Sequence, residues 1–503
     1  MSMNLRTLLD DATLPDVQIE GLTEDSRQVK AGDGFIAIRG AVVDGHDFAM
    51  DAERRGAMAV LAQRADLKVN IPVVAVAQLP ARRGALAAKL YGDPSRNLRC
   101  VGVTGTNGKT SIAHFIADLA GRLGEPAGYM GTIGWGDIGS LEQTKLTTED
   151  AVTIQKRLAR FAKEGKHWVA MEASSHALHQ GRVDDVAFHT AVFSNLSRDH
   201  LDYHPTFDDY AQAKSRLFEC VSLQLAVVNV DDPFGRTLEQ RLLQRSGRRL
   251  LQRSGRRLLQ RSGRRPVKRL AVLSYGSGDA DIRWRDLRFS NTGVCGKWST
   301  PWGSAEFSLP LVGEFFVANV AAALGVLCSA GHDLTTVVSA AEKIVPVPGR
   351  MEFFQVSGGP AVVVDFAHTP DALEKVLATL RRHTEGELVC VFGCGGDRDP
   401  GKRPLMARTA ERCADVLWLT SDNPRSEDPE HIISDMRKGL MDPGNTFELP
   451  DRTEAITRAV ESACAEDLIL VAGKGHEQYQ EIQGQRIPYS DRELVARLTG
   501  GMN

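Results

Sequence analysis

A glycine-rich segment, residues 104–110 (TGTNGKT), lies between an apolar run and a helix-like pattern. The backbone N–H groups of such a turn, together with the N-terminus of the following helix, can cradle phosphate oxygens. Lys109 would reach the β and γ oxygens of a nucleotide, and the Thr110 hydroxyl would bind Mg²⁺. Val103 stands where the strict phosphate-loop pattern has its first glycine, so Gly105 must supply the turn. The flanking strand and helix favour a phosphate loop over a chance glycine turn.

A second group of polar segments lies in the last third of the chain. Apolar, strand-like runs occupy residues 361–365, 388–392, 416–420 and 468–472. Each run is followed by a polar loop rich in glycine or proline, at residues 366–370, 393–398, 421–425 and 473–477. Ligands of open α/β sheets bind at the carboxyl ends of the strands. These loops therefore predict a second binding region.

The elements around both regions indicate the fold class. Residues 98–103 are typical of a short buried strand, and a helix is expected from about Thr110 to Gly124. One face of that helix carries the apolar residues Ile112, Phe115, Ile116, Leu119 and Leu123. Strand–helix alternation continues to about residue 345, which predicts a doubly wound parallel sheet. The alternation of runs and helical patterns after residue 346, such as residues 372–382, predicts a second, Rossmann-like sheet.

The first 98 residues predict a separate, small α/β domain. Strands are expected at residues 34–38 and 71–76, and a helix at residues 48–55. The turn-rich stretch 91–95 is typical of a boundary. The sequence thus predicts an α/β protein of three domains, with boundaries at 1–98, 99–345 and 346–503.

Composition and charge narrow the functional classes. The chain has 503 residues, 42% of them hydrophobic, and a net charge of −3, which favours neither nucleic acid nor an anionic membrane as partner. Eight cysteines without a CxxC pair are typical of reduced thiols in a cytosolic protein. Asp10 and Asp11 interrupt the segment where a signal peptide needs an apolar run. With no apolar run of about 18 residues, a cytoplasmic protein without membrane insertion is expected.

One internal repeat departs from this composition. The sequence RLLQRSGR occurs three times without a mismatch, at residues 241–264, and brings nine arginines and no acid. Such a segment could be a basic arm for nucleic acid or anionic lipid. It could equally be a tandem duplication that lengthens a surface connection, which we favour because loop closure entropy grows slowly with length.

The phosphate loop by itself leaves motor, switch, kinase and ligase open. Further motifs follow it in order, and together they resemble the Mur ligase family, whose members add amino acids to the UDP-linked peptidoglycan precursor. The resemblance covers essentially the whole chain except the arginine repeat. Its motifs after the phosphate loop are MEASSHAL (171–178), NLSRDHLDYH (195–204), Ala213-Lys214, GRME (349–352), DFAHTPDAL (365–373), FGCGGDRDPGKRPLM (392–406), DNPRSEDP (422–429) and GKGHE (473–477).

The resemblance implies an ATP-dependent ligase that forms a peptide bond through an acyl phosphate. ATP and Mg²⁺ are then required, and the small-molecule substrates are the only expected partners of a monomer. The implied catalytic residues are Lys109, Glu172, His200 and Lys214. The implied metal ligands are Thr110, Glu172, His200 and Lys214, the last as a carbamate.

The resemblance also implies three sets of ligand contacts. For ATP these are Gly105, Thr106, Asn107, Gly108, Lys109, Thr110, Ser111, Asn319, Arg350, Asp365 and His368, with Phe316 where the family has another asparagine. For the UDP-sugar peptide they are Glu24, Ser26, Ala41, Val42, Val43, Thr147, Thr148, Ser174, Gln180 and Arg182, with Leu146 where close relatives carry asparagine. For the amino acid they are Arg398, Asp422, Asn423, Pro424, Arg425, Gly473 and Glu477.

The amino acid implied by the DNPR motif is diaminopimelate, which resembles lysine with a further carboxylate at its far end. Arg425 could grip that carboxylate with its planar fork. Lysine would leave a buried Arg425 unpaired, which is a large penalty. Within this enzyme class, the alternatives are the same reaction with L-lysine, ligation of a recycled cell-wall tripeptide and folate polyglutamylation. From another class, a P-loop ATPase or polyanion-binding module would use the arginine repeat.

Overall fold

The computed structural model describes residues 2–40, 43–197, 199–200, 203–246, 270–290, 293–355 and 358–500. They fold into two compact units, which are treated one at a time below. The first unit comprises Met1–Arg283, Thr300–Gly303 and Asn319–Val337, and the second comprises Trp284–Ser299, Ser304–Ala318 and Val338–Asn503. Both contain a mostly parallel sheet with helices, so the predicted α/β class is confirmed.

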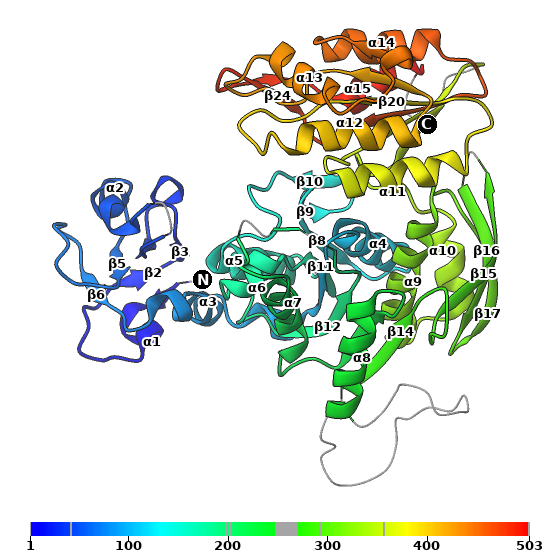
Figure 1. Cartoon of the computed structure of the whole chain (residues 1–503). Coiled ribbons are helices and arrows are strands. Elements are labelled where there is room, and N and C mark those ends of the chain that lie inside the picture. Colours follow the sequence, from blue (N-terminus) through cyan, green and yellow to red (C-terminus); the bar gives the residue numbers. More distant parts are fainter. Residues whose placement is uncertain are drawn as a thin grey trace. The chain divides into compact units, whose positions relative to one another are not determined.

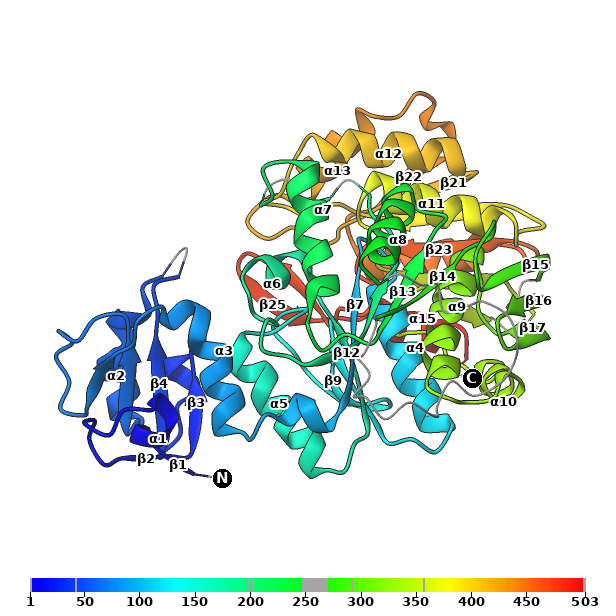
Figure 2. The same cartoon turned by 90° about the horizontal axis from the view of Figure 1, so that it is seen from below.

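A four-stranded parallel sheet, in the order β3-β4-β5-β6, forms the N-terminal part of the first unit. Successive strand side chains alternate between its faces, so Ile36 packs with α1 and α3 while Phe35 packs with α2. Figure 2 shows α2 and α3 on opposite sides of this sheet. The predicted strands and helix are confirmed to within two residues. The bounds are β1 Met3–Asn4, α1 Leu5–Leu9, β2 Gln18–Ile19, β3 Gly21–Thr23, β4 Asp33–Ala37, α2 Ala49–Arg54, β5 Ala59–Ala62, β6 Val73–Ala75 and α3 Leu79–Leu90.

The main sheet of the first unit has the order β10-β9-β8-β11-β7-β12-β13-β14 (Figure 1). The six strands from β8 to β14 run parallel, and β9 and β10 extend one edge antiparallel. The strand bounds are β7 Arg99–Thr104, β8 Ala127–Gly131, β9 Gly134–Asp137, β10 Ser140–Glu142, β11 Trp168–Glu172, β12 Phe188–Phe193, β13 Leu225–Asn229 and β14 Ala271–Tyr275. The helix bounds are α4 Lys109–Arg122, α5 Ala151–Lys163, α6 Ser175–His179, α7 Phe207–Ser215 and α8 Pro233–Ser246.

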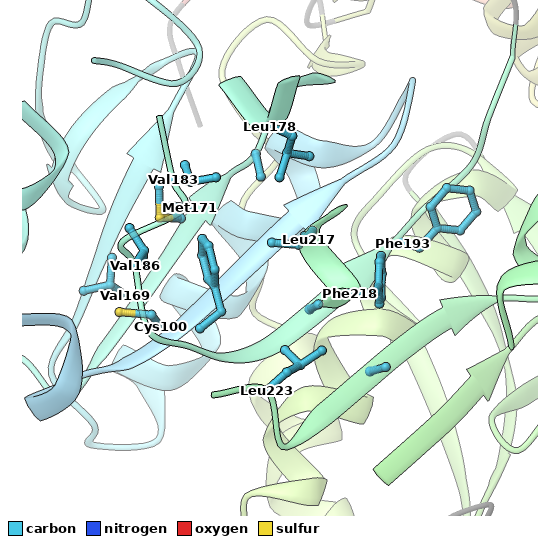
Figure 3. Close-up of a cluster of buried hydrophobic side chains, with 14 of the residues drawn as sticks. Cys100, Val169, Met171, Leu178, Val183, Val186, Phe193, Leu217, Phe218 and Leu223 are labelled. Carbon is cyan, nitrogen blue, oxygen red and sulfur yellow. The ribbon is translucent and has the colours of Figure 1, made fainter. Parts of the chain in front are cut away.

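Apolar packing holds the strand ends of this sheet in place. All five residues of β11 are buried, as is typical of a parallel strand covered on both faces. Figure 3 shows part of the core on one face, where Cys100 and Val169 from neighbouring strands meet Leu217 and Phe218. On α4 the predicted apolar face is confirmed for Ile112, Phe115, Ile116 and Leu119, which are fully buried. The fifth predicted residue, Leu123, follows the end of the helix and is only partly buried.

The second unit holds a six-stranded sheet in the order β18-β19-β23-β20-β21-β22, in which only β18 is antiparallel to its neighbour. Helices α14 and α15 pack on one face through Ile456 and Val495. The strand bounds are β18 Glu352–Gln355, β19 Ala361–Asp365, β20 Leu388–Phe392, β21 Val416–Leu419, β22 Thr446–Glu448, β23 Leu468–Ala472, β24 Tyr479–Ile482 and β25 Gln485–Pro488. The helix bounds are α11 Pro370–Arg381, α12 Lys402–Cys413, α13 Pro429–Arg437, α14 Arg452–Ser462 and α15 Asp491–Leu498.

The predicted strand–helix alternation up to residue 345 is wrong for residues 283–309. There the chain forms three successive strands, β15 (Arg283–Ser290), β16 (Gly293–Thr300) and β17 (Gly303–Leu309), which make a separate sheet. Trp298 stacks on Phe307 with ring centroids 4.3 Å apart, so aromatic packing stabilises this sheet. Helices α9 (Glu314–Ser329) and α10 (Leu334–Ala341) follow.

Two predictions about special segments have different outcomes. The arginine repeat begins within the last part of α8, at Arg241, and its residues 247–264 lie outside the described residues. Of the helices in the described ranges, none combines the length and apolar character needed to traverse a bilayer.

Candidate active site

The predicted phosphate loop joins β7 to α4. Gly105 and Gly108 have φ angles of 148° and 84°, a region that favours glycine. A Cβ on Gly105 would overlap Ser194 Oγ and lie 3.0 Å from Asn195 N, so a side chain there would displace the loop. Helix α4 begins at Lys109 without a side-chain cap, which leaves its first N–H groups for an anion.

Segments far away in the sequence brace this loop. Asn107 N donates to Asn195 Oδ1 at 2.9 Å, and Ser197 N donates to Thr106 Oγ1 at 3.0 Å. Asn319 Oδ1 would lie 2.8 Å from a Cβ on Gly108, so the structure brings this predicted ATP residue to the loop. Phe316, by contrast, is a buried residue with 1% exposure. Sequence reasoning missed the bracing role of Asn195 and Ser197.

Two lysines meet at one carbonyl of the loop. Lys109 Nζ donates to Gly105 O and Thr106 O at 3.0 and 2.9 Å, and Lys214 Nζ donates to Gly105 O at 2.7 Å. The Lys214 side chain is buried against the Tyr210 ring, with Nζ 4.4 Å from its centroid. Burial, reinforced by the charge of Lys109, holds the pKa of Lys214 well below its usual range.

Glu172, at the end of β11, is 1% exposed and fully hydrogen-bonded. It accepts from Thr110 Oγ1 at 3.0 Å, from Tyr129 OH at 2.7 Å and from Thr132 N at 2.7 Å. The structure thus joins two of the predicted metal ligands, Thr110 and Glu172. Tyr129 and Thr132 were missed, although a buried carboxylate needs donors and β8 lies next to β11.

His200 lies in a cluster of rings. Its backbone has a φ of 54°, which is uncommon for a residue other than glycine and is often found at functional sites. Its side chain is 43% exposed, with Nε2 3.4 Å from Asp199 Oδ2. Its ring centroid lies 6.0 Å from that of Tyr210, the ring that also covers Lys214.

The donor atoms beside the phosphate loop fit Mg²⁺. Thr110 and Glu172 supply adjacent oxygens, the hard ligands that Mg²⁺ prefers. In the described part of the chain, no group of three or more His, Cys, Asp and Glu side chains is arranged to hold a metal ion. The donors therefore fit an ion that takes one or two protein oxygens and completes its shell with phosphate and water.

The residues predicted for the UDP-sugar peptide form a network next to Glu172. Thr148 Oγ1 donates to Glu172 O at 2.8 Å and accepts from Ser174 N at 3.1 Å. Arg182 donates to Thr148 O at 2.9 Å and to Gln180 Oε1 at 2.8 Å. Thr147 Oγ1 accepts from Thr132 at 3.1 Å. The loop 144–149 is fixed by Arg157, which donates to Glu149 Oε1 at 3.0 Å.

Glu24 connects the small sheet to this network. Its Oε1 lies 3.3 Å from Arg83 Nε, and both side chains are largely buried. Burial, together with the nearby Asp150 carboxylate, raises the pKa of Glu24 to about 7, and Arg83 and Arg182 oppose this rise. Arg83 was not predicted from the sequence.

The other predicted UDP-sugar residues are placed only in part. Ser26 is buried in the short 3₁₀ helix Ser26–Gln28, and Val43 is 52% exposed. Ala41 and Val42 lie outside the described residues.

In the second unit, the predicted nucleotide residues gather around Phe366. Arg350 lies over the Phe366 ring at 4.5 Å, and the His368 ring centroid is 4.7 Å from it. Asp365 is buried and accepts from Met351 N and Ala367 N at 2.8 and 2.7 Å. Its pKa is raised because burial outweighs the attraction of Arg350.

Two of the ligand loops in this unit are in close backbone contact. Gly349 has a φ of 66°, and a Cβ on it would overlap the backbone of Gly475 and His476. The loop that carries Arg350 therefore cannot separate from the loop that carries Glu477 without losing this packing.

The predicted amino-acid residues come from three loops at the carboxyl ends of β20, β21 and β23. Gly396 N donates to Asn423 O at 2.9 Å, which ties the first loop to the second. A Cβ on Gly473 would lie 2.5 Å from Asp422 Oδ2, so the third loop also approaches the second. A Cβ on Gly396 would overlap Pro424 O.

Arg425 and Arg398 both lie close to Gly395. A Cβ on Gly395 would be 2.9 Å from Arg425 Nη1 and 3.6 Å from Arg398 Cγ. Arg425 donates to Gly396 O at 2.7 Å and lies 3.4 Å from Glu481 Oε2, whereas Arg398 is exposed. The β24–β25 hairpin, missed in the sequence, holds Arg425 through Glu481 O.

Three family models match the chain in succession. They are the Mur ligase family catalytic domain (residues 18–90), the Mur ligase middle domain (residues 103–327) and the Mur ligase glutamate ligase domain (residues 349–475). The chain belongs to the Mur ligase family. Its predicted resemblance to these ligases is thereby confirmed.

Similar proteins within the Mur ligase family cover nearly the full length. Two are named UDP-N-acetylmuramoyl-L-alanyl-D-glutamate–2,6-diaminopimelate ligase. The one from Chromobacterium violaceum is 46% identical and aligns over 96% of this chain and 94% of its own. The one from Pseudomonas aeruginosa is 43% identical and aligns over 99% and 98%.

Solved structures of Mur ligases agree with this assignment. A ligase of the same name superposes with a TM-score of 0.70 at 38% identity, over 99% of both chains. The UDP-N-acetylmuramoylalanyl-D-glutamyl-2,6-diaminopimelate–D-alanyl-D-alanyl ligase of Acinetobacter baumannii superposes with a TM-score of 0.68, over 95% of this chain and 96% of its own. At 19% identity, the latter supports the fold alone.

Proposed function

We propose that this chain is an ATP-dependent ligase that joins meso-diaminopimelate to UDP-N-acetylmuramoyl-L-alanyl-D-glutamate. Relatives that are 43–46% identical carry this reaction in their names. The observation that supports the substrate best is the Arg425 guanidinium beside Gly395, with the Glu477 carboxylate on an adjoining loop. A cation and an anion on adjoining loops suit an amino acid end that carries both a carboxylate and an ammonium group.

The reaction needs an activated carboxyl group. Transfer of the γ-phosphoryl group of ATP to the substrate carboxylate gives ADP and an acyl phosphate. The amine of the incoming amino acid attacks the carbonyl carbon, phosphate leaves, and the amine loses a proton as the amide forms. Positioning and charge neutralisation are then the main tasks of the protein. Lys109 and the N–H groups of residues 105–111 bind the phosphates, and Arg182 binds an anionic group of the UDP-sugar peptide.

Two features of the phosphate-loop region support a metal-assisted reaction. Thr110 and Glu172 would hold Mg²⁺, which supplies charge neutralisation for the transferring phosphoryl group. Lys214, with a lowered pKa, would react as its neutral amine with CO₂ and release a proton to give a carbamate. Glu172, His200 and this carbamate are the proposed ligands of a second ion.

The remaining assignments follow the family pattern. Asn319, Arg350, Asp365 and His368 are proposed as nucleotide ligands. Glu24, Ser26, the segment 41–43, Thr147, Thr148, Ser174 and Gln180 are proposed for the UDP-sugar peptide. We place domain boundaries at 1–98, 99–345 and 346–503, supported by the three matched segments. We further propose a cytoplasmic monomer.

The test is product formation with three acceptors side by side. ATP, Mg²⁺ and UDP-N-acetylmuramoyl-L-alanyl-D-glutamate are incubated with meso-diaminopimelate, with L-lysine or with no amino acid, and phosphate release and product mass are measured. Product with diaminopimelate alone is expected, because lysine lacks the second carboxylate that Arg425 would bind. Product with lysine instead would retain the ligase chemistry and refute the proposed specificity. No product with either would refute the proposed function.

A further inference from the structure

Lys474, in the loop after β23, is a lysine whose side chain is fully buried, with 0% exposure. Its Nζ donates to Asn423 Oδ1 at 2.9 Å and to Glu477 Oε2 at 2.8 Å. A buried ammonium group is unfavourable unless it is paired and hydrogen-bonded. Both partners belong to the set proposed above for the amino acid, whereas Lys474 itself has no assigned role.

Asn423 closes a triangle with this pair. Its Nδ2 donates to Glu477 Oε2 at 2.9 Å, and its Oδ1 also accepts from Glu481 N at 2.9 Å. Each side chain of the triangle is therefore held by the other two, and Asn423 is further fixed to the β24–β25 hairpin. This is the geometry of a preorganised binding site.

The triangle uses only one oxygen of Glu477. Both hydrogen bonds reach Oε2, while Oε1 has no hydrogen-bond partner within the described ranges. The Glu477 side chain keeps 21% exposure, so a ligand can reach it. Lys474 thus fixes the direction of Oε1 and also balances the charge of the carboxylate.

We propose that Lys474 is a positioning residue for the amino-acid substrate. It holds Glu477 and Asn423 so that Glu477 Oε1 meets the ammonium group next to the carboxylate that Arg425 binds. Because Lys474 neutralises Glu477, the pocket favours an amino acid end that carries both charges over a simple amine. This inference rests on the ligase function proposed above.

The experiment measures KM and kcat of the full-length enzyme for each substrate in turn. In Lys474→Met, the KM for diaminopimelate is expected to rise roughly tenfold or more, because the Glu477 carboxylate is no longer held in its binding orientation. The KM values for ATP and for the UDP-sugar peptide are expected to stay within about twofold. Lys438→Met, which removes an exposed lysine that pairs with Asp435 on α13, is the matched control and is expected to change none of them.

A double-mutant cycle separates positioning from a general structural role. Since Lys474 acts through Glu477, Lys474→Met is expected to add little to the KM effect of Glu477→Gln. Additive effects, or an unchanged KM for diaminopimelate in Lys474→Met, would overturn the inference. Thermal unfolding checks that the variants are folded, and Lys474→Gln, which keeps a donor, replaces the methionine variant if the latter unfolds. Failure of the wild-type enzyme to form product would instead refute the proposed function.

Discussion

The phosphate loop of the first unit and the amino-acid loops of the second unit hold their cations in different ways. In the phosphate loop, Lys109 donates to two carbonyl oxygens of the loop itself. Arg425 and Lys474 are paired with the carboxylates Glu481 and Glu477. A polyanionic nucleotide can draw a lysine away from a neutral carbonyl, because the ammonium group then gains the attraction of a full negative charge.

The paired charges of the second unit suit a different ligand. An amino acid with equal numbers of carboxylates and ammonium groups has little net charge, so it gains more from a pocket of balanced charges than from a cationic one. When the amino acid binds, its own ion pairs must replace those already present in the pocket. Recognition therefore depends on how well the positions of its charges match those of the pocket. The first site selects for negative charge, and the second selects for the arrangement of both charges.

Backbone geometry differs between the two sites as well. The phosphate loop uses glycines at its positive φ positions. The amino-acid loops place Asp397, Arg425 and Gln483 in the left-handed region, with φ between 49° and 54°. Such positions cost about 1–3 kcal/mol each for side chains that lack compensation, and they persist only where surrounding contacts enforce them. The β24–β25 hairpin supplies those contacts for Arg425.

The largest effect is expected at the phosphate loop. Lys109→Met should lower kcat on the order of 10³-fold, since the transferring phosphoryl group loses a fixed cation. Steady-state phosphate release with saturating substrates measures it. Lys163→Met, at the exposed end of α5, is the control. A kcat within about tenfold of wild type would contradict the assigned role and remove one side of the comparison.

The next largest effect is expected at the amino-acid loops, and in KM rather than kcat. Arg425→Ala should raise the KM for diaminopimelate about 100-fold, because the variant loses a bidentate carboxylate contact. The KM for ATP should be unchanged. Arg437→Ala on α13, which removes an exposed arginine paired with Glu448, controls for loss of charge. An unchanged KM for diaminopimelate would show that geometry at Arg425 does not select the ligand.

A smaller effect is expected from Glu24, a carboxylate that lies outside both the phosphate loop and the amino-acid loops. Its pKa is raised to about 7 in the folded chain, whereas an ordinary glutamate has a pKa of 4.5. Between these pH values the unfolded chain releases the proton and the folded chain keeps it, so wild type loses stability as pH rises. Glu24→Gln removes this loss and should gain on the order of 2 kcal/mol over wild type between about pH 5 and pH 8.

Urea unfolding of both proteins at the two pH values measures the difference. The same gain at both pH values would mean that Glu24 ionises normally in the folded chain. The stability difference between the variant and wild type would then come only from the altered hydrogen bonding of residue 24.

The smallest effect is expected from the arginine repeat. Deleting residues 249–264 removes two of its three copies, and kcat and all KM values should stay within about twofold, because shortening a connection changes loop entropy little. The same assays measure it, at low and high salt. A large, salt-dependent loss of activity would mean that polyanion binding contributes to function, which neither site explains.

The sequence is most informative where burial is uniform. The runs 361–365, 388–392 and 468–472 coincide with β19, β20 and β23, because parallel strands covered on both faces are continuously apolar. Strand β15 was missed, since RWRDLRFS has mostly exposed polar residues and only Trp284 buried. The β24–β25 hairpin has no buried residue to mark it.

The candidate site residues show a similar contrast, between those that lie in a local sequence motif and those that do not. Residues in dense motifs, such as Lys109, Glu172 and Arg425, could be predicted as candidates from the sequence. Arg83 and Thr132 could not, because they reach the site only through tertiary packing, and Thr132 does so partly through its backbone N–H. A residue whose side chain braces another carries no local signal of its own.

Gly349 packs so closely against Gly475 that the loop carrying Arg350 and the loop carrying Glu477 must move together. A ligand that orders the Phe366 region therefore also orders the loop after β23, which carries Lys474 and Glu477. Occupancy of one loop therefore lowers the entropy that remains to be lost at the other, and the two ligands should bind with positive cooperativity. An inhibitor that occupies only one of these loops would then bind more tightly in the presence of the other loop's natural ligand.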